Sequence, residues 1–108
     1  MELIDTHAHI HFEKFNDDFD EMLARAQDAS VKRIICIGAG DGSISMKTAL
    51  ELAKKHSHIK STAGVHPHDA EIDESPDDLL NFIRTNPSYV KAVGETGLDF
   101  YRDWSPKA

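Results

Sequence analysis

Cysteine and long apolar stretches are nearly absent from this chain of 108 residues. Its single cysteine, Cys36, cannot form an internal disulfide, and its place in the apolar run from Ile34 to Ile37 predicts a buried thiol in the core. No apolar run approaches the ~18 to 20 residues that a membrane span requires. The acids Glu2 and Asp5 occupy positions where a signal peptide would carry basic residues. We therefore expect a cytoplasmic protein with no membrane partner.

Basic residues are also scarce. The chain has 12 Lys and Arg residues against 19 Asp and Glu residues, a net charge of −7. Such a chain repels nucleic acid as a whole, so a phosphate-bearing substrate needs a local attraction, either a metal ion or a small basic patch. The glycine-rich segment 38–42 has neither the spacing of a P-loop nor that of a dinucleotide-binding loop, and we assign it no nucleotide role.

Apolar runs alternate with amphipathic runs along the whole chain. Runs rich in β-branched and other apolar residues predict strands at residues 2–6, 32–37, 60–65 and 89–94. Helices are predicted between them, from about residue 19, at about residues 45–55 and from Ser75. The βαβαβαβ order is typical of an α/β fold with a parallel sheet covered on its faces. Residues 1–108 contain no linker, so we expect one domain.

The predicted helices have recognisable starts. Asn16 and Asp17 are cap candidates for the first helix, and Ser75 followed by a proline is typical of a helix start. The buried stripe of the third helix is predicted to consist of Leu79, Leu80 and Ile83.

Polar side chains gather where the predicted strands end. His7 and His9 close the first strand, and Glu95 closes the fourth. Alternate residues of a strand share a face, so both imidazoles can reach one cation, and Glu95 can add a carboxylate from another strand end. Parallel α/β sheets place their sites at this edge. Taken alone, a His-x-His pair near a terminus is a weak signal and is more typical of surface or tag-like histidines; the strand-end position and Glu95 favour the ligand reading.

Two further His-x-His pairs follow. His66 and His68 flank a proline after the third strand, where they are either solvated side chains of a rigid loop or groups for phosphate contact and proton transfer. His56 and His58 lie in a polar connection between a helix and a strand, and we predict that they are solvated.

Asp99 lies just beyond Glu95. It can orient a ligand or cap the next turn, and we group it with Glu95 as a candidate catalytic residue. The aromatic residues Phe100, Tyr101 and Trp104 follow closely. We expect them to pack over the exposed sheet end, although aromatic rings there can also stack a base.

Three separated motifs together resemble one known family. D-T-H-A-H-I at residues 5–10, G-V-H-P-H at 64–68 and G-E-T-G-L-D-F-Y at 94–101 are similar to the amino-terminal part of the TatD family of metal-dependent deoxyribonucleases, in the amidohydrolase-like group of TIM barrels. The resemblance runs across essentially the whole chain, including K-R-I-I-C-I-G and Y-R-D-W-S-P-K.

The resemblance implies a (β/α)8 hydrolase with two divalent cations, Mg, Mn or Zn, that cleaves phosphodiester bonds of DNA. By position, it implies that His7 and His9 bind the first metal and that Glu95 bridges both. His66 and His68 are implied to lie near the substrate phosphate. His11 departs from the family pattern, which commonly has an acid there, so we do not assign it to the metal.

A complete TIM barrel takes about 250 residues. The family's remaining metal ligands, two histidines and an aspartate, come from later strands. We therefore expect residues 1–108 to be a partial barrel domain, about the first half, whose continuation is missing. Its free strand edges and uncovered inner face call for a second barrel half, another copy of the chain or the native continuation.

Two other functions stay open at this point. A related amidohydrolase-type metal hydrolase of small esters or amides would share the His-x-His pair on its first strand. An inactive fragment that keeps only a metal-binding remnant would share it as well.

Overall fold

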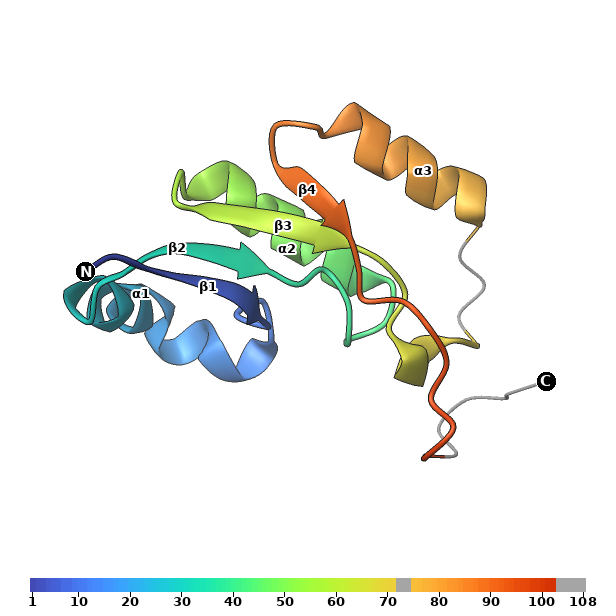
Figure 1. Ribbon diagram of the computed structural model, residues 1–108, viewed down its shortest axis with the longest axis horizontal. Coiled ribbons are helices and arrows are strands. Elements are labelled where there is room, and N and C mark those ends of the chain that lie inside the picture. Colours follow the sequence, from blue (N-terminus) through green and yellow to red (C-terminus); the bar gives the residue numbers. More distant parts are fainter. Residues whose placement is uncertain (72–74, 103–108) are drawn as a thin grey trace.

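A parallel sheet is the centre of the structure. The computed structural model describes residues 1–71 and 75–102. Within them, the sheet has the order β1-β2-β3-β4, with the strands β1 (Leu3–Ala8), β2 (Val31–Cys36), β3 (Ile59–Ala63) and β4 (Val90–Val93). The arrowheads of all four strands point the same way in Figure 1. The predicted α/β class and parallel order are confirmed, and β1 extends two residues further than expected, so that His7 lies inside the strand.

Helices connect the strands. The α-helices are α1 (Phe19–Asp28), α2 (Ile44–Lys55) and α3 (Pro76–Thr85), and two short 3-10 helices are η1 (Glu13–Asp18) and η2 (Pro67–Asp69). The start of α3 follows the sequence signals, because Ser75 Oγ accepts a hydrogen bond from the Asp78 N–H at 3.5 Å and a proline opens the first turn. The described residues contain no helix that is long and apolar enough to cross a membrane.

One face of the sheet packs against helices. Ile34 and Cys36 of β2 and Ile59 of β3 alternate with more exposed neighbours and are 4%, 0% and 0% exposed. They form a cluster with buried residues of α1 and α2, including Leu23 and Ala49. Burying a side chain of this size stabilises the fold by about 1.5 to 3 kcal/mol. The prediction that Cys36 is a core thiol is confirmed.

The opposite face is covered by no helix among the described residues. Ile4 on β1 and Val93 on β4 are each 57% exposed, although both are large apolar residues in strands. Ile4, Arg33 and Lys60 contribute to the lining of a hollow of about 450 Å³ at the amino-terminal ends of the first three strands. The expectation of a sheet covered on both faces is therefore wrong for these residues, whereas the expected uncovered inner face is present.

Two predictions about the helices are wrong. Asn16 and Asp17 do not cap α1, because η1 runs directly into that helix and both residues lie within η1. Leu80 does not belong to the buried stripe of α3 and is 43% exposed. Phe82 takes its place beside Leu79 and Ile83, because a step of one residue turns a side chain by about 100° around the helix.

Two further predictions about side-chain surroundings are also wrong. His56 and His58 are half-buried instead of solvated, and the Nε2 atom of each is buried without a hydrogen-bond partner. Phe19 packs on His56, with ring centroids 5.7 Å apart, because α1 lies over this connection. Phe100 and Tyr101 are 71% and 91% exposed, since the chain runs away from the sheet after β4 (Figure 1). Trp104 lies outside the described residues.

Candidate metal centre

The carboxyl ends of β1 and β4 bring three predicted ligands together. His7 lies in β1, His9 directly follows it, and Glu95 follows β4. One ligand atom from each residue lies within 4.8 Å of the other two. β1 and β4 form the two edges of the sheet, so the twist and curl of the sheet must close the distance between them. The geometry brings these three predicted residues to one point.

A backbone contact sets the orientation of the His9 ring. His9 Nδ1 lies 3.1 Å from the carbonyl oxygen of Ala39, at the end of β2. A carbonyl oxygen can only accept a hydrogen bond, so Nδ1 of His9 must carry the hydrogen and donate it. In the neutral ring, Nε2 then has no hydrogen and presents a lone pair. Metal-ligating histidines are commonly held by a hydrogen bond of this kind.

The lone pair of His9 faces a carboxylate oxygen. Glu95 Oε2 lies 3.2 Å from His9 Nε2 and 3.5 Å from His7 Nε2, and it is buried without a hydrogen-bond partner among the described residues. Electron pairs on two atoms at this separation repel each other unless a cation, either a proton or a metal ion, lies between them. Two imidazole nitrogens and one carboxylate oxygen form the donor set of open, mixed N/O catalytic metal sites. The residues present therefore fit a divalent cation.

The glycine-rich loop after β2 supports His9. Gly40 has a φ of +102°, and a Cβ atom there would lie 3.4 Å from Cε1 of His9 and 3.3 Å from the ring of Phe12. Phe12 in turn stacks on His9, with ring centroids 5.0 Å apart and planes inclined by 24°. Sequence reasoning assigned this loop no nucleotide role and did not find its contact with the histidine. The signal available in the sequence was the glycine at residue 40 itself, because glycine permits a positive φ.

His66 lies beside the same carboxylate, whereas His68 faces the carboxylate of Asp99. His66 Nε2 is 3.6 Å from Glu95 Oε1, the oxygen that the first histidine pair does not face. His68 Nε2 is 2.8 Å from Asp99 Oδ2. The two rings are 4.5 Å apart between centroids. The loop after β3 is thus tied to the segment after β4 at two points.

Asp99 is held as a carboxylate. Its Oδ1 atom accepts hydrogen bonds from the N–H groups of Tyr101 and Arg102, at 2.8 and 3.0 Å. The Arg102 N–H is the main cause that lowers the pKa of Asp99 below its ordinary value, and the Tyr101 N–H and the His68 side chain add to the effect. Both roles considered for this residue, a turn cap and an orienting acid, are compatible with this geometry.

His11 lies below the site in the core. It is 7% exposed, its Nε2 atom is 3.1 Å from Ser45 Oγ, and its Nδ1 atom is 3.6 Å from Cys36 Sγ. Burial is the main cause that lowers the pKa of His11 to about 4, with the charge of His9 adding to it. Burial also raises the pKa of Cys36 to about 11. His11 joins the segment after β1 to the first turn of α2, a structural role that its sequence position did not indicate.

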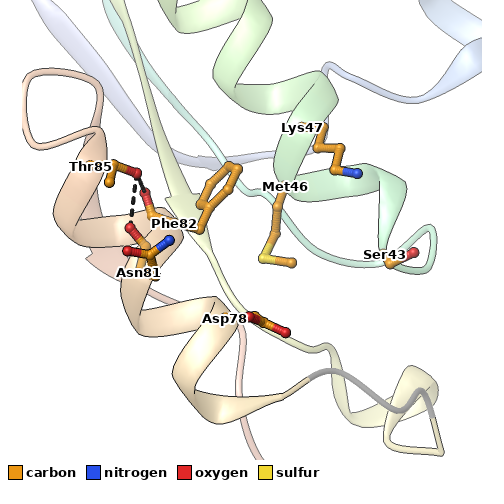
Figure 2. Close-up of a pocket in the computed structure, with 7 residues that line it drawn as sticks. All are labelled: Ser43, Met46, Lys47, Asp78, Asn81, Phe82 and Thr85. Atoms are coloured by element: carbon orange, nitrogen blue, oxygen red, sulfur yellow. Dashed lines mark hydrogen bonds between the residues drawn. The ribbon is translucent and has the colours of Figure 1, made fainter.

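A cavity elsewhere contains none of these residues. It has a volume of about 430 Å³ and opens between the first turns of α2 and one side of α3 (Figure 2). It is lined by Ser43, Met46, Lys47, Asp78, Asn81, Phe82 and Thr85. The hydroxyl of Thr85 donates its hydrogen to the carbonyl oxygens of Asn81 and Phe82, at 2.8 and 3.2 Å. None of the lining residues belongs to the candidate centre, so the cavity is separate from it.

Comparisons with known proteins agree with one another. The family model for TatD-related DNases matches residues 4–108. Over 107 residues, the chain is 37% identical to the uncharacterized metal-dependent hydrolase YabD of Bacillus subtilis. The alignment covers 97% of this chain and 40% of YabD. Over 93 residues, it is 39% identical to the 3'-5' ssDNA/RNA exonuclease TatD of Salmonella typhimurium. This alignment covers 85% of this chain and 35% of that protein.

A solved structure matches in the same way. The crystal structure of YJJV, a TatD homolog from Escherichia coli, aligns with 94% of this chain at a TM-score of 0.75 and 31% identity, and the chain covers 39% of YJJV. The partial TIM-barrel architecture is therefore confirmed. The chain spans about two fifths of the length of the relatives that it matches.

Proposed function

Because the chain belongs to the family of TatD-related DNases, we propose that it supplies the His7, His9 and Glu95 part of a divalent-metal centre that hydrolyses phosphodiester bonds in nucleic acid. One observation carries the proposal. The buried Glu95 Oε2 atom has no hydrogen-bond partner and faces the imidazole nitrogens of both histidines. The two imidazole nitrogens and the carboxylate oxygen are already close together, and a cation between them would remove the repulsion among their lone pairs.

The chemistry fits the charge of the chain. At a complete centre, two divalent cations supply positive charge that polarises a phosphoryl oxygen, activates water and stabilises the leaving oxygen. A chain with a net charge of −7 needs such a local attraction for a phosphate. His7 and His9 would hold the first cation, and Glu95, with two carboxylate oxygens, would be shared with the second.

We propose substrate-side roles for the second histidine pair. His66 and His68 lie at the rim of the centre, each partly exposed, where they can contact a phosphate group. Asp99 fixes the His68 ring through Nε2, so we propose that this carboxylate acts on the substrate through His68. A carboxylate that already accepts three hydrogen bonds holds its charge well and is a poor proton acceptor, which favours this positioning role.

The substrate is proposed from a relative. The Salmonella protein is named a 3'-5' exonuclease of single-stranded DNA and RNA. We propose single-stranded DNA, attacked from the 3' end, as the substrate of the complete centre. Labelled single-stranded DNA, double-stranded DNA and single-stranded RNA should be compared, together with small phosphate and carboxylate esters. Cleavage of the small esters alone would favour the related amidohydrolase-type activity.

The complete centre requires more than the described residues. The uncovered sheet face exposes Ile4 and Val93 together with the cations Arg33 and Lys60. Within the described residues, each edge strand has a partner on one side only. We propose that residues 1–108 form one partial barrel domain, completed by a second barrel half that carries apolar and acidic side chains. A second copy would bring the same two cations to this face. Size-exclusion chromatography with light scattering distinguishes the cases, since a stable dimer would favour self-association.

Metal titration tests the proposal directly. Calorimetry with Mn²⁺ and Zn²⁺ should detect a site in the wild-type chain, and His9→Ala and Glu95→Gln should each abolish it. Glu51→Gln is the control, because Glu51 is an exposed acid whose ion-pair partner is Lys54 on the same helix. Binding that survives both site substitutions contradicts the proposal.

Cleavage assays then separate an enzyme from a remnant. With Mg²⁺ or Mn²⁺ present, nuclease activity that is lost in Glu95→Gln supports catalysis by the chain. Activity that persists in that variant identifies a contaminant. Metal binding without any cleavage supports the reading of an incomplete centre that needs its second half.

A further inference from the structure

The carboxylate of Glu95 is bracketed from two sides. Its Oε2 atom faces His7 and His9, while its Oε1 atom faces Nε2 of His66 at 3.6 Å. Glu95 follows an edge strand, and its side chain is 29% exposed. Three torsions orient a glutamate side chain, so a group beside Oε1 decides whether Oε2 stays aimed at the histidine pair.

The backbone of its own loop determines the hydrogen position on His66. His66 Nδ1 accepts a hydrogen bond from the N–H of His68 at 3.0 Å, and Pro67 between them holds the turn in which this contact forms. A nitrogen that accepts from a backbone N–H carries no hydrogen itself. In the neutral ring the hydrogen is therefore on Nε2, the atom that faces Glu95.

We propose that His66 is a positioning residue that donates its Nε2–H to Glu95 Oε1 and so keeps Oε2 directed at His7 and His9. The inference rests on the metal centre proposed above; it replaces the phosphate contact proposed there for His66 and leaves that contact to His68. A donor nitrogen at Nε2 also cannot ligate a cation, so His66 is a neighbour of the centre and not one of its ligands.

The separation of 3.6 Å is slightly longer than a hydrogen bond. A shift of about 0.4 Å in the His66 side chain would bring the two atoms within hydrogen-bond range. Each carboxylate oxygen has two lone pairs, so one on Oε1 accepts from His66 and the other stays available for a second cation. Groups that hold a ligating carboxylate in this way typically change metal affinity by about 10 to 100-fold when they are removed.

Metal affinity measures this role. His66→Ala should weaken binding of Mn²⁺ or Zn²⁺ by about 10 to 100-fold in calorimetry. His66→Gln, whose amide can place an N–H near the position of Nε2, should recover most of that loss. His58→Ala and His58→Gln are the matched controls, because His58 precedes β3 at the opposite end of the strand from the centre and should leave the affinity unchanged. Wild-type affinity in His66→Ala overturns the inference, as does a His66→Gln variant that binds no better than His66→Ala.

A second readout needs no metal. Long-range ¹H–¹⁵N correlation spectra of the metal-free chain identify which ring nitrogen of each histidine carries the hydrogen. His66 should show the Nε2–H tautomer, and the Nδ1–H tautomer would overturn the inference even if affinity fell. A wild-type chain that binds no metal refutes the proposed function as well, whereas loss of binding in Glu95→Gln with full binding in His66→Ala refutes only the role of His66.

Discussion

Gly64 directly follows β3 and lies against the backbone of Gly94 and Glu95. A Cβ atom at residue 64 would lie 2.5 Å from the backbone oxygen of Glu95 and 2.7 Å from the carbonyl carbon of Gly94. Ordinary contacts between non-bonded heavy atoms begin at about 3.5 Å, so Gly64→Ala must push this segment away by about 1 Å. Preorganised sites tolerate displacements of about 0.5 Å. We therefore expect the substitution to weaken Zn²⁺ or Mn²⁺ binding by about 10 to 100-fold, although residue 64 is not a ligand.

Gly94→Ala is the matched control for this experiment. Apart from its two chain neighbours, a Cβ atom at residue 94 meets no atom of the described residues within 4 Å, so this variant should bind metal like the wild type. Calorimetric titration measures both affinities, and urea denaturation should show that Gly64→Ala is still folded but loses about 1 to 3 kcal/mol of stability through overpacking. Equal metal affinities of the two folded variants would refute the idea that contact with β3 positions Glu95.

Three further predictions concern stability and reactivity. The pKa of His11 is about 4 in the folded chain and about 6.5 when unfolded, so its contribution to stability is present above pH 6.5 and is lost as the pH falls toward 4. Urea denaturation should show a loss of about 2 kcal/mol between pH 8 and pH 5 that is absent in His11→Asn, and equal pH dependence in both proteins would contradict this. Because burial raises the pKa of Cys36 to about 11, an aromatic disulfide reagent at pH 8 should label the native chain far more slowly than the urea-unfolded chain, and equal rates would argue against its burial. Ile59→Ala should cost about 2 to 5 kcal/mol of unfolding free energy, because Ile59 is fully buried, and Leu80→Ala below about 1 kcal/mol, because Leu80 is 43% exposed; the reverse order in urea denaturation would refute the assigned packing.

The location of the centre could be predicted because it depends on a repeating local pattern. Alternating strand and helix signals predict a parallel sheet, and in such a sheet the carboxyl ends of all strands share one edge. His7, His9 and Glu95 each lie at or just beyond a strand end, so topology places them at the same end of the sheet, and the curl of the sheet brings the ends of β1 and β4 together. The same reasoning left His11 unassigned, since nothing in its immediate sequence shows that Cys36 and Ser45 would surround it.

The errors share a physical origin. Leu80 has the right chemistry for a core, yet α3 meets the sheet through Leu79 and Ile83, so the rotation of the helix about its axis decides which leucine is buried. Phe100 and Tyr101 are aromatic but exposed, because the chain leaves the sheet after β4. Hydrophobicity states a preference for burial, and only the arrangement of neighbouring elements decides whether a partner surface is present.

The chain contains four His-x-His pairs, counting His9 with His11, and the sequence by itself determined which of them lie at carboxyl strand ends. It did so because strand and helix periods are properties of a few consecutive residues. Only the tertiary structure decided what each ring faces: His9 is oriented by Ala39 O, 30 residues away, and meets Glu95 from the opposite edge of the sheet, while His56 is covered by Phe19. Hydrogen-bond partners and burial arise from distant segments that packing brings together, and this information is not contained in any local pattern.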